Sequence, residues 1–441
     1  MSETLEQLKR VIESSSDAVL LQLELHLARA AGATAAKMRD FISRERSDRE
    51  LCGQIFGPLT PLFRRPTAPD ELRFPPAAAR LLWRGLLRIA PDEVAALRVE
   101  WPDRHIAPID PARLDRLVAL SALALQARDV PEFGQLAELC ETADAAGAER
   151  LAGAMRLAPL VRAIAPKLES WTLHPDQDTA AAARLAYRDA TSFDVAAGPL
   201  FFEMIAGQLA EPWRALRVIS QVMDLPPERY LAQSEAGPFA ERLLAAVDQN
   251  LAGVAAFHET ATDVDLALHA TKLALRQLRE MQLCVRLDPQ QPWGARVAAQ
   301  RQQLREMLET IFNGLPKAIE AALPQRTVRS GLRRRSEPAL DATPLPAAIE
   351  AARGRLRFIR ALGPQAEEIG VSVLRAQLLE RHERQIEAYV ETALHQPAPF
   401  LPKASALLHA AGELLGAIRP DAAELVRRRA AAAMSALPAA A

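Results

Sequence analysis

"TDVDLALHATKLALRQLREMQLCVRL", residues 262–287, is the stretch of this chain that decides its fold. Apolar residues recur in it at spacings of three and four, which is the period of an α-helix. They cover more than one face, so the sequence predicts a helix with a central place in its bundle. Thr262 is the expected N-cap of this helix.

The same period runs through nearly all of the 441 residues, and alternating strand-like runs between Asn-Gly or Asp-Gly turns are absent. Aromatic residues make up only 5%, so we expect a core of Leu, Ala, Val and Ile. Many of the 32 prolines stand where helices are expected to begin, and there the missing N–H group costs little. The sequence therefore predicts an all-α fold, an irregular multi-helix bundle array with two or three helical subdomains.

The length of the chain exceeds what one hydrophobic core usually serves. Irregular helix lengths argue against tetratricopeptide, HEAT or armadillo arrays, and a helical solenoid remains the alternative. Pro-rich punctuation divides the chain into four predicted parts. These are an N-terminal helical block (1–170), a central long-helix bundle (171–323), an Arg/Pro-rich linker (324–346) and a C-terminal helical module (347–441).

Charge and composition restrict the classes of function. The formal net charge is −1, so no global field attracts nucleic acid or an acidic membrane. Lys occurs at few positions and Arg at many, which favours a GC-rich bacterial genome and weakens any argument from Arg clusters. The three cysteines show no CxxC spacing and are interpreted as reduced core thiols. The most hydrophobic run, residues 17–33, is too short and too charged to span a bilayer, so a cytoplasmic protein without a transmembrane segment is expected.

One stretch gathers basic residues without any acid, "RTVRSGLRRR", residues 326–335. Guanidinium groups bind phosphate oxygens well, so an anion-binding site is one hypothesis. The preferred interpretation is a linker without a specific ligand, because glycine, serine and proline disfavour helix and no aromatic residue offers a stacking platform. The candidate anion-binding residues are Arg326, Arg329, Arg333, Arg334 and Arg335.

Signatures of catalysis and of cofactor binding are missing. The sequence contains no GxxxxGK[ST] or GxGxxG loop, no HExxH and no GxSxG, so neither a cofactor nor a metal is expected. His258, Asp265 and His269 lie near one helix start, and a metal site there is the weaker interpretation. Acids at the positive end of a helix dipole explain the same pattern.

Two further charged clusters have ordinary structural interpretations. Residues 380–384 are expected to form a solvated, salt-bridged helix face, with Glu380 and Arg384 as an i, i+4 pair. Asp189, Asp194 and Glu203 lie near Phe201 and Phe202 and were candidates for an acid/base set. Helical periodicity favours the phenylalanines in the core and the acids as caps.

These patterns favour a non-catalytic helical scaffold or adaptor that mediates protein–protein interaction in the cytoplasm. One alternative is binding of nucleic acid or anionic lipid through residues 326–335. Another is an all-helical enzyme whose site is assembled from scattered residues. The sequence identifies no particular protein partner.

Overall fold

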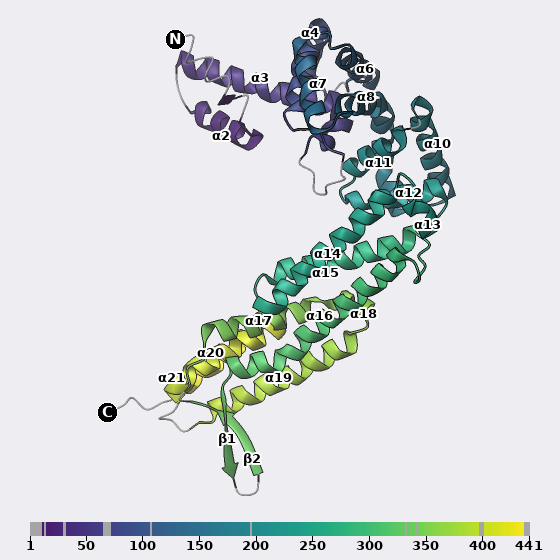
Figure 1. The fold of residues 1–441 in the computed structure, drawn as a ribbon. Helices are drawn as coiled ribbons and strands as arrows, with labels where there is room; N and C mark the ends of the chain where they lie inside the picture. The colour runs from purple at the N-terminus through teal and green to yellow at the C-terminus, as the bar shows by residue number, and fades with distance from the viewer. Residues whose placement is uncertain are drawn as a thin grey trace. The chain divides into compact units, whose positions relative to one another are not determined.

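The computed structural model describes residues 11–12, 15–29, 32–64, 72–105, 108–194, 196–330, 333–340, 342–396 and 401–435. It confirms the all-α fold, because one hairpin accounts for both named strands of this part and the other regular elements are helices (Figure 1). None of the helices described is both long enough and apolar enough to cross a membrane.

Backbone contacts divide the chain into two compact units. The first consists of Met1–Pro226 and Leu231–Phe239, and the second of Pro227–Tyr230 and Ala240–Ala441. The division falls inside the stretch that the sequence predicts as a central bundle, residues 171–323. The finer domain boundaries taken from the sequence remain predictions.

Apart from α3, which has 23 residues, the described helices of the first unit have 18 residues or fewer. Proline stands in the first turn of several of them, as its missing N–H group favours. Most of these helices are connected by only a few residues. The elements are α2 (Asp17–Ala28), α3 (Ala33–Ile55), η1 (Gly57–Phe63), α4 (Ala78–Ile89), α5 (Pro91–Glu100), η2 (Trp101–Asp103), α6 (Pro111–Ala127), α7 (Pro131–Ala143), α8 (Gly147–Ile164), η3 (Ala165–Lys167), α9 (Leu168–Leu173), α10 (Gln177–Phe193), α11 (Ala197–Gln208), η4 (Pro212–Arg214) and α12 (Ala215–Met223).

Two helical hairpins of this unit, α7–α8 and α10–α11, turn in the same way. Asp144 and Asp194 follow the first helix of each pair in extended conformation, with φ −160 and −163. Their carboxylates accept hydrogen bonds from the N–H groups of Ala146 (3.3 Å) and Ala196 (2.9 Å). Each second helix begins three residues after the aspartate, and α8 packs against α11. This local repeat was missed in the sequence, where the two turns share only Asp-x-Ala.

The second unit holds the longest helices. Helices α13 (Glu228–Ala232) and α14 (Gly237–Thr260) begin at the division between the units. The remaining elements are α15 (Val264–Cys284), α16 (Pro292–Ala322), β1 (Gln325–Ser330), β2 (Arg333–Pro338), α17 (Pro346–Ala361), α18 (Gly363–Ile369), α19 (Ser372–Leu394), α20 (Leu401–Ile418) and α21 (Ala422–Ser435).

Helix α15, the stretch that decides the fold, is largely buried as predicted. Leu275, Leu278 and Met281 are among its buried residues, but Leu266 and Leu283 are 64% and 53% exposed, so one side faces solvent. The N-cap is Asp263 in left-handed conformation, not Thr262 as expected. Helix α17 packs on α15, α16 and α20, and α20 in turn packs on α19 and α21.

The start of α16 is capped by a carboxylate from far away in the sequence. Glu228 is only 3% exposed and accepts hydrogen bonds from the backbone N–H groups of Trp293 (2.5 Å) and Gly294 (3.0 Å). Gln291, the N-cap residue, provides no side-chain bond. The first N–H groups of a helix have no partner within the helix, so Glu228 supplies what the local sequence lacks.

Arginine side chains cap helix C-termini, as Glu228 caps the N-terminus of α16. The last carbonyl groups of a helix also lack partners within the helix, and a cation there is favoured by the helix dipole. Guanidinium groups from other elements donate to such carbonyls within both units. The pairs are Arg162 with Gln54 and Ile55 of α3, Arg217 with Thr172 of α9, Arg184 with Gln221 of α12, Arg355 with His258 of α14, Arg375 with Ile359 and Arg360 of α17, Arg301 with Glu368 of α18, and Arg360 with Ile418 of α20. These seven arginines therefore have a structural role.

Candidate functional site

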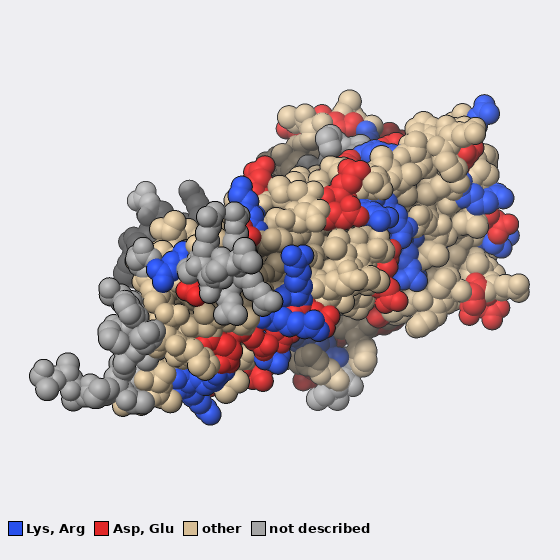
Figure 2. All heavy atoms as spheres, turned by 90° about the horizontal axis from the view of Figure 1, so that it is seen from below, with Lys and Arg blue, Asp and Glu red and all other residues tan. Residues whose placement is uncertain are grey.

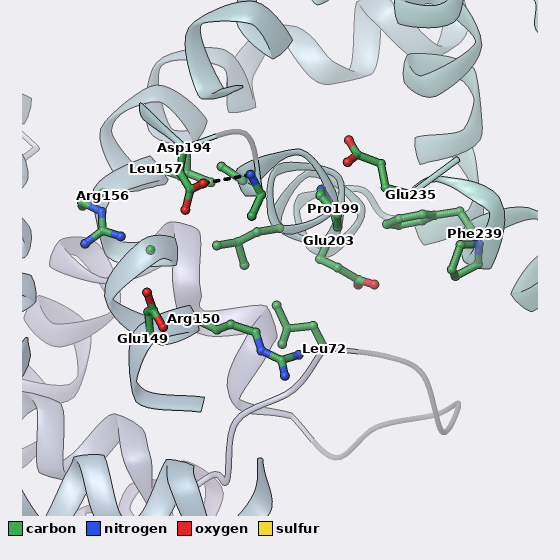
Figure 3. Close-up of a pocket in the computed structure, with 15 residues that line it drawn as sticks. Leu72, Glu149, Arg150, Arg156, Leu157, Asp194, Pro199, Glu203, Glu235 and Phe239 are labelled. Atoms are coloured by element: carbon green, nitrogen blue, oxygen red, sulfur yellow. Dashed lines mark hydrogen bonds between the residues drawn. The ribbon is translucent and has the colours of Figure 1, made fainter. Parts of the chain in front are cut away.

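A pocket of about 460 Å³ opens in the first unit (Figure 3). Helix α8 forms one side, and α11 with the turns before α11 and α14 forms the other. The apolar part of its lining includes Leu72, Leu157, Leu200 and Phe239. The charged residues that line it are Glu149, Arg150, Arg156, Asp194, Glu203 and Glu235.

An aromatic cluster adjoins the pocket through Phe239, which lines it. The ring of Tyr187 stacks on Phe202 with centroids 5.1 Å apart, and Phe202 meets Phe239 edge to face at 6.0 Å. Phe201 and Phe202 are fully buried, which confirms the prediction that both belong to the core. These contacts fix α10, α11 and the start of α14 relative to one another within the first unit.

Glu235 is exposed, yet its carboxylate is held in one place. The hydroxyl group of Tyr187 donates a hydrogen bond to it. A Cβ atom on Gly198 would lie 2.0 Å from Oε1 of Glu235 and 2.8 Å from the Tyr187 oxygen, so a larger residue would require the Glu235 carboxylate to move. Burial, and then the bond to Glu235, raise the pKa of Tyr187, so its hydroxyl group remains a donor. The result is a carboxylate oriented at the edge of the pocket.

Glu203 is the buried carboxylate of the site. It is 6% exposed, and its Oε2 lies 3.7 Å from Nη1 of Arg73. A buried carboxylate needs such compensation because removing its charge from water is costly. The expectation that the acids act as caps holds for Asp194, whose carboxylate bonds the turn at Ala196, and is wrong for Glu203. Asp189 does not line the pocket.

Helix α8 contributes a second charged side, separated in Figure 3 from Glu235 and Phe239. Glu149, Arg150 and Arg156 are all exposed there. Arg150 forms an ion pair with Asp144, in the turn before α8. The pocket therefore has charges of both signs around apolar groups, and it continues onto an exposed helix surface.

The second unit has a hollow of a different kind. It measures about 440 Å³, and residues of α19, α20 and α21 line it. Its charged residues bond mainly to each other: Arg419 pairs with Glu383 and Glu387, and Arg429 pairs with Glu391 through two hydrogen bonds. Because these charges satisfy one another, the hollow is a weaker candidate than the pocket of the first unit.

The Arg-rich stretch forms a hairpin where the sequence predicts an irregular linker. Strands β1 and β2 pair antiparallel, with Arg329 opposite Arg334 and Arg326 opposite Glu337. The carbonyl oxygen of Pro324 accepts hydrogen bonds from the N–H group of Ala339 (3.1 Å) and the hydroxyl group of Tyr389 (3.2 Å), which anchors the base of the hairpin. Both flanking helices, α16 and α17, belong to the second unit and pack on each other.

The described residues leave the anion-binding hypothesis for the hairpin untested. The side chain of Arg326 is exposed. The side chains of Arg329, Arg333, Arg334 and Arg335 lie outside the described part of the chain. Anion binding by this stretch remains a prediction from sequence.

Two other predicted clusters have clear outcomes. Glu380 and Arg384 form the expected exposed ion pair, but the sequence prediction is wrong for His382, which is 1% exposed. Asp265 and His269 are exposed on α15, and the carbonyl group of His258 binds Arg355. Among the residues described, no three His, Cys, Asp or Glu side chains are grouped closely enough to hold a metal ion.

The charged surface is mixed. On the face drawn in Figure 2, basic and acidic side chains are interspersed and do not separate into patches of one sign. Basic residues pair with acidic residues, as in the ion pairs Arg113–Glu100 (2.6 Å) and Arg305–Glu309 (2.9 Å). Each such exposed pair contributes about 0–1 kcal/mol, so their main effect is to balance charge locally.

No family model, curated protein or solved structure matches this chain. The pocket itself therefore carries the functional argument. Tyr187, Gly198 and Glu235 were all missed as site residues from the sequence. Gly198 before a proline at a helix start was a local signal, whereas the contact of Tyr187 with Glu235 joins residues 48 apart and left no pattern.

Proposed function

We propose that this chain is a non-catalytic helical adaptor that holds a protein partner through the pocket of its first unit. The supporting observation is the orientation of Glu235 by Tyr187 and Gly198 at the edge of a pocket with apolar lining. A few fixed polar groups beside apolar surface are typical of binding sites, in which the apolar part gives affinity and the polar part gives specificity.

A protein segment fits this pocket better than an enclosed small substrate. The pocket continues onto exposed residues of α8, including Arg150 and Arg156, where an extended segment can continue. Two acids of the pocket interact with other side chains, since Glu235 accepts a hydrogen bond from Tyr187 and Glu203 forms an ion pair with Arg73. Such bonds favour a fixed recognition surface over a group that accepts and releases protons during a reaction.

The two equivalent turns provide a matched test. Ala196 lines the pocket, while Ala146 occupies the same position of the α7–α8 turn outside it, and both are exposed. We expect Ala196→Trp to obstruct the pocket and Ala146→Trp to leave it open, with similar thermal stability for both. Proteins crosslinked to the wild-type chain in cells of its source are then compared quantitatively by mass spectrometry. At least one is expected to be lost with Ala196→Trp and kept with Ala146→Trp, and identical profiles for the two variants would contradict the proposal.

A further inference from the structure

We infer that the pocket binds an arginine side chain in an extended segment of the partner, with Glu235 as its carboxylate partner. This inference rests on the proposed adaptor function and adds the chemical class of the ligand. The first reason is the position of the carboxylate. The hydrogen bond from Tyr187 orients Glu235 although its side chain is exposed to water, and Gly198 leaves the room that this pair needs. A carboxylate fixed before binding loses little conformational freedom when a cation arrives.

The geometry favours arginine over lysine. A carboxylate offers about four lone-pair positions, and the single hydroxyl hydrogen of Tyr187 occupies one of those on Glu235. A planar guanidinium group can therefore donate two parallel hydrogen bonds to this carboxylate, which the ammonium group of lysine cannot do. Pro199 and Phe239 line the same side of the pocket, as Figure 3 shows, and provide apolar surface for the aliphatic stem of arginine.

The rest of the lining favours a peptide over free arginine or another small guanidine. Leu72, which is only half-buried, adds apolar surface that a guanidine alone does not cover. Arg156, on α8, can pair with polar or acidic groups of neighbouring residues in a peptide. Charges of both signs on α8 also explain why the ligand is not simply a polycation.

The test uses the full-length protein and three blocked pentapeptides with leucine at both ends. Their central residue is arginine, citrulline or glutamate, and agmatine serves as the small guanidine. Citrulline keeps the shape of arginine and lacks its charge. Binding is measured by isothermal titration calorimetry with the wild-type chain, Glu235→Gln and Glu149→Gln. Glu149 is the matched control because it is also an exposed carboxylate that lines the pocket.

We expect the arginine peptide to bind about tenfold more tightly than the citrulline peptide, with no measurable binding of the glutamate peptide. Glu235→Gln should remove this preference, whereas Glu149→Gln should keep it. Equal binding of the arginine and citrulline peptides would overturn the inference, as would an unchanged preference in Glu235→Gln or no binding of any peptide up to about 1 mM. Agmatine that binds as tightly as the arginine peptide would also overturn it, because the ligand would then be a small guanidine.

Failure of this inference is distinguishable from failure of the adaptor proposal. In the crosslinking comparison, a partner lost with Ala196→Trp but retained by Glu235→Gln leaves the adaptor function standing and removes the arginine ligand. If neither variant changes the crosslinked proteins, both proposals fail. If both variants lose the same partner while Glu149→Gln retains it, both are supported.

Discussion

The hydroxyl group of Tyr187, in α10, donates its hydrogen bond to the carboxylate of Glu235, in the turn before α14. Water is available to satisfy an exposed carboxylate, so this ordering has to come from the protein. Gly198 provides the space, and the stacking of Tyr187 on Phe202 provides the support. The three elements that contribute these residues therefore determine the direction in which Glu235 can accept a ligand.

Alkaline titration of the tyrosines tests the hydrogen bond between Tyr187 and Glu235. The chain has three tyrosines; the pKa of Tyr187 is raised by burial and by Glu235, that of Tyr389 is raised by burial, and Tyr230 is exposed. We predict that ultraviolet absorbance shows two of the three tyrosines, Tyr187 and Tyr389, ionising only above pH 10, the ordinary value. Glu235→Gln should move one of the late tyrosines toward lower pH. Because an unfolded chain loses these protons first, stability should fall as the pH rises above about 10.

Removal of the distant cap on α16 should weaken the second unit. Glu228→Ala leaves the N–H groups of Trp293 and Gly294 without their acceptor in a buried place. We expect a cost of about 2–3 kcal/mol, the upper range for a cap that is also a charge-assisted hydrogen bond. Hydrogen exchange of the first turn of α16 should become faster, whereas the exposed Glu367 changed to alanine should have no effect. Unchanged exchange in Glu228→Ala would show that the cap is not needed.

The arginines at helix ends should not tolerate lysine. Arg375 donates from Nε to the carbonyl oxygen of Ile359 (2.7 Å) and from Nη2 to that of Arg360 (2.5 Å). Lysine cannot reproduce this fork, so Arg375→Lys should destabilise the chain by about 1–2 kcal/mol in urea unfolding. The comparison variant is Arg384→Lys in the same helix, whose exposed ion pair with Glu380 should change stability by less than about 0.5 kcal/mol. An equal loss of stability in the two variants would mean that the two hydrogen bonds from Arg375 contribute no more than an exposed ion pair.

His382 should make the second unit sensitive to acid. Burial lowers its pKa, and Arg381 acts in the same direction, while the bond to Gln385 and the charge of Glu320 oppose them. Below about pH 6.5 the unfolded chain therefore binds a proton that the folded chain resists, and stability should fall as the pH decreases through that value. Urea unfolding of His382→Gln at several pH values should show a smaller fall. His395→Gln, at the exposed end of α19, should retain the full fall.

The fold class was predictable because helical period is a local property. Residues 262–287 carried enough apolar positions to fix a buried helix, and the structure confirms it as α15. The start of that helix was mispredicted because Asp263, in left-handed conformation, is its N-cap in place of Thr262. The hairpin at 325–338 was missed because its strands consist mainly of arginine and other polar residues, which lack the apolar alternation of a half-buried strand.

The candidate site was only partly predictable. Asp194 and Glu203 were noticed near two phenylalanines, but periodicity gave no reason to expect a pocket there. Glu235 was not noticed, because its significance depends on Tyr187, which belongs to another helix. His382 shows the opposite error, since a charged neighbourhood in sequence suggested solvent and the packing buried it. Contacts between distant helices decide all three cases, and a single sequence does not contain them.

Site-specific photo-crosslinking tests the central claim most directly. A benzophenone amino acid is introduced at Ala196, in the pocket, or at Ala146, in the equivalent turn outside it, and the chain is irradiated in cells of its source. We predict an adduct from position 196 but not from position 146, on a partner peptide that contains arginine next to the crosslinked residue. Absence of an adduct at position 196, or the same adducts at both positions, would contradict the account.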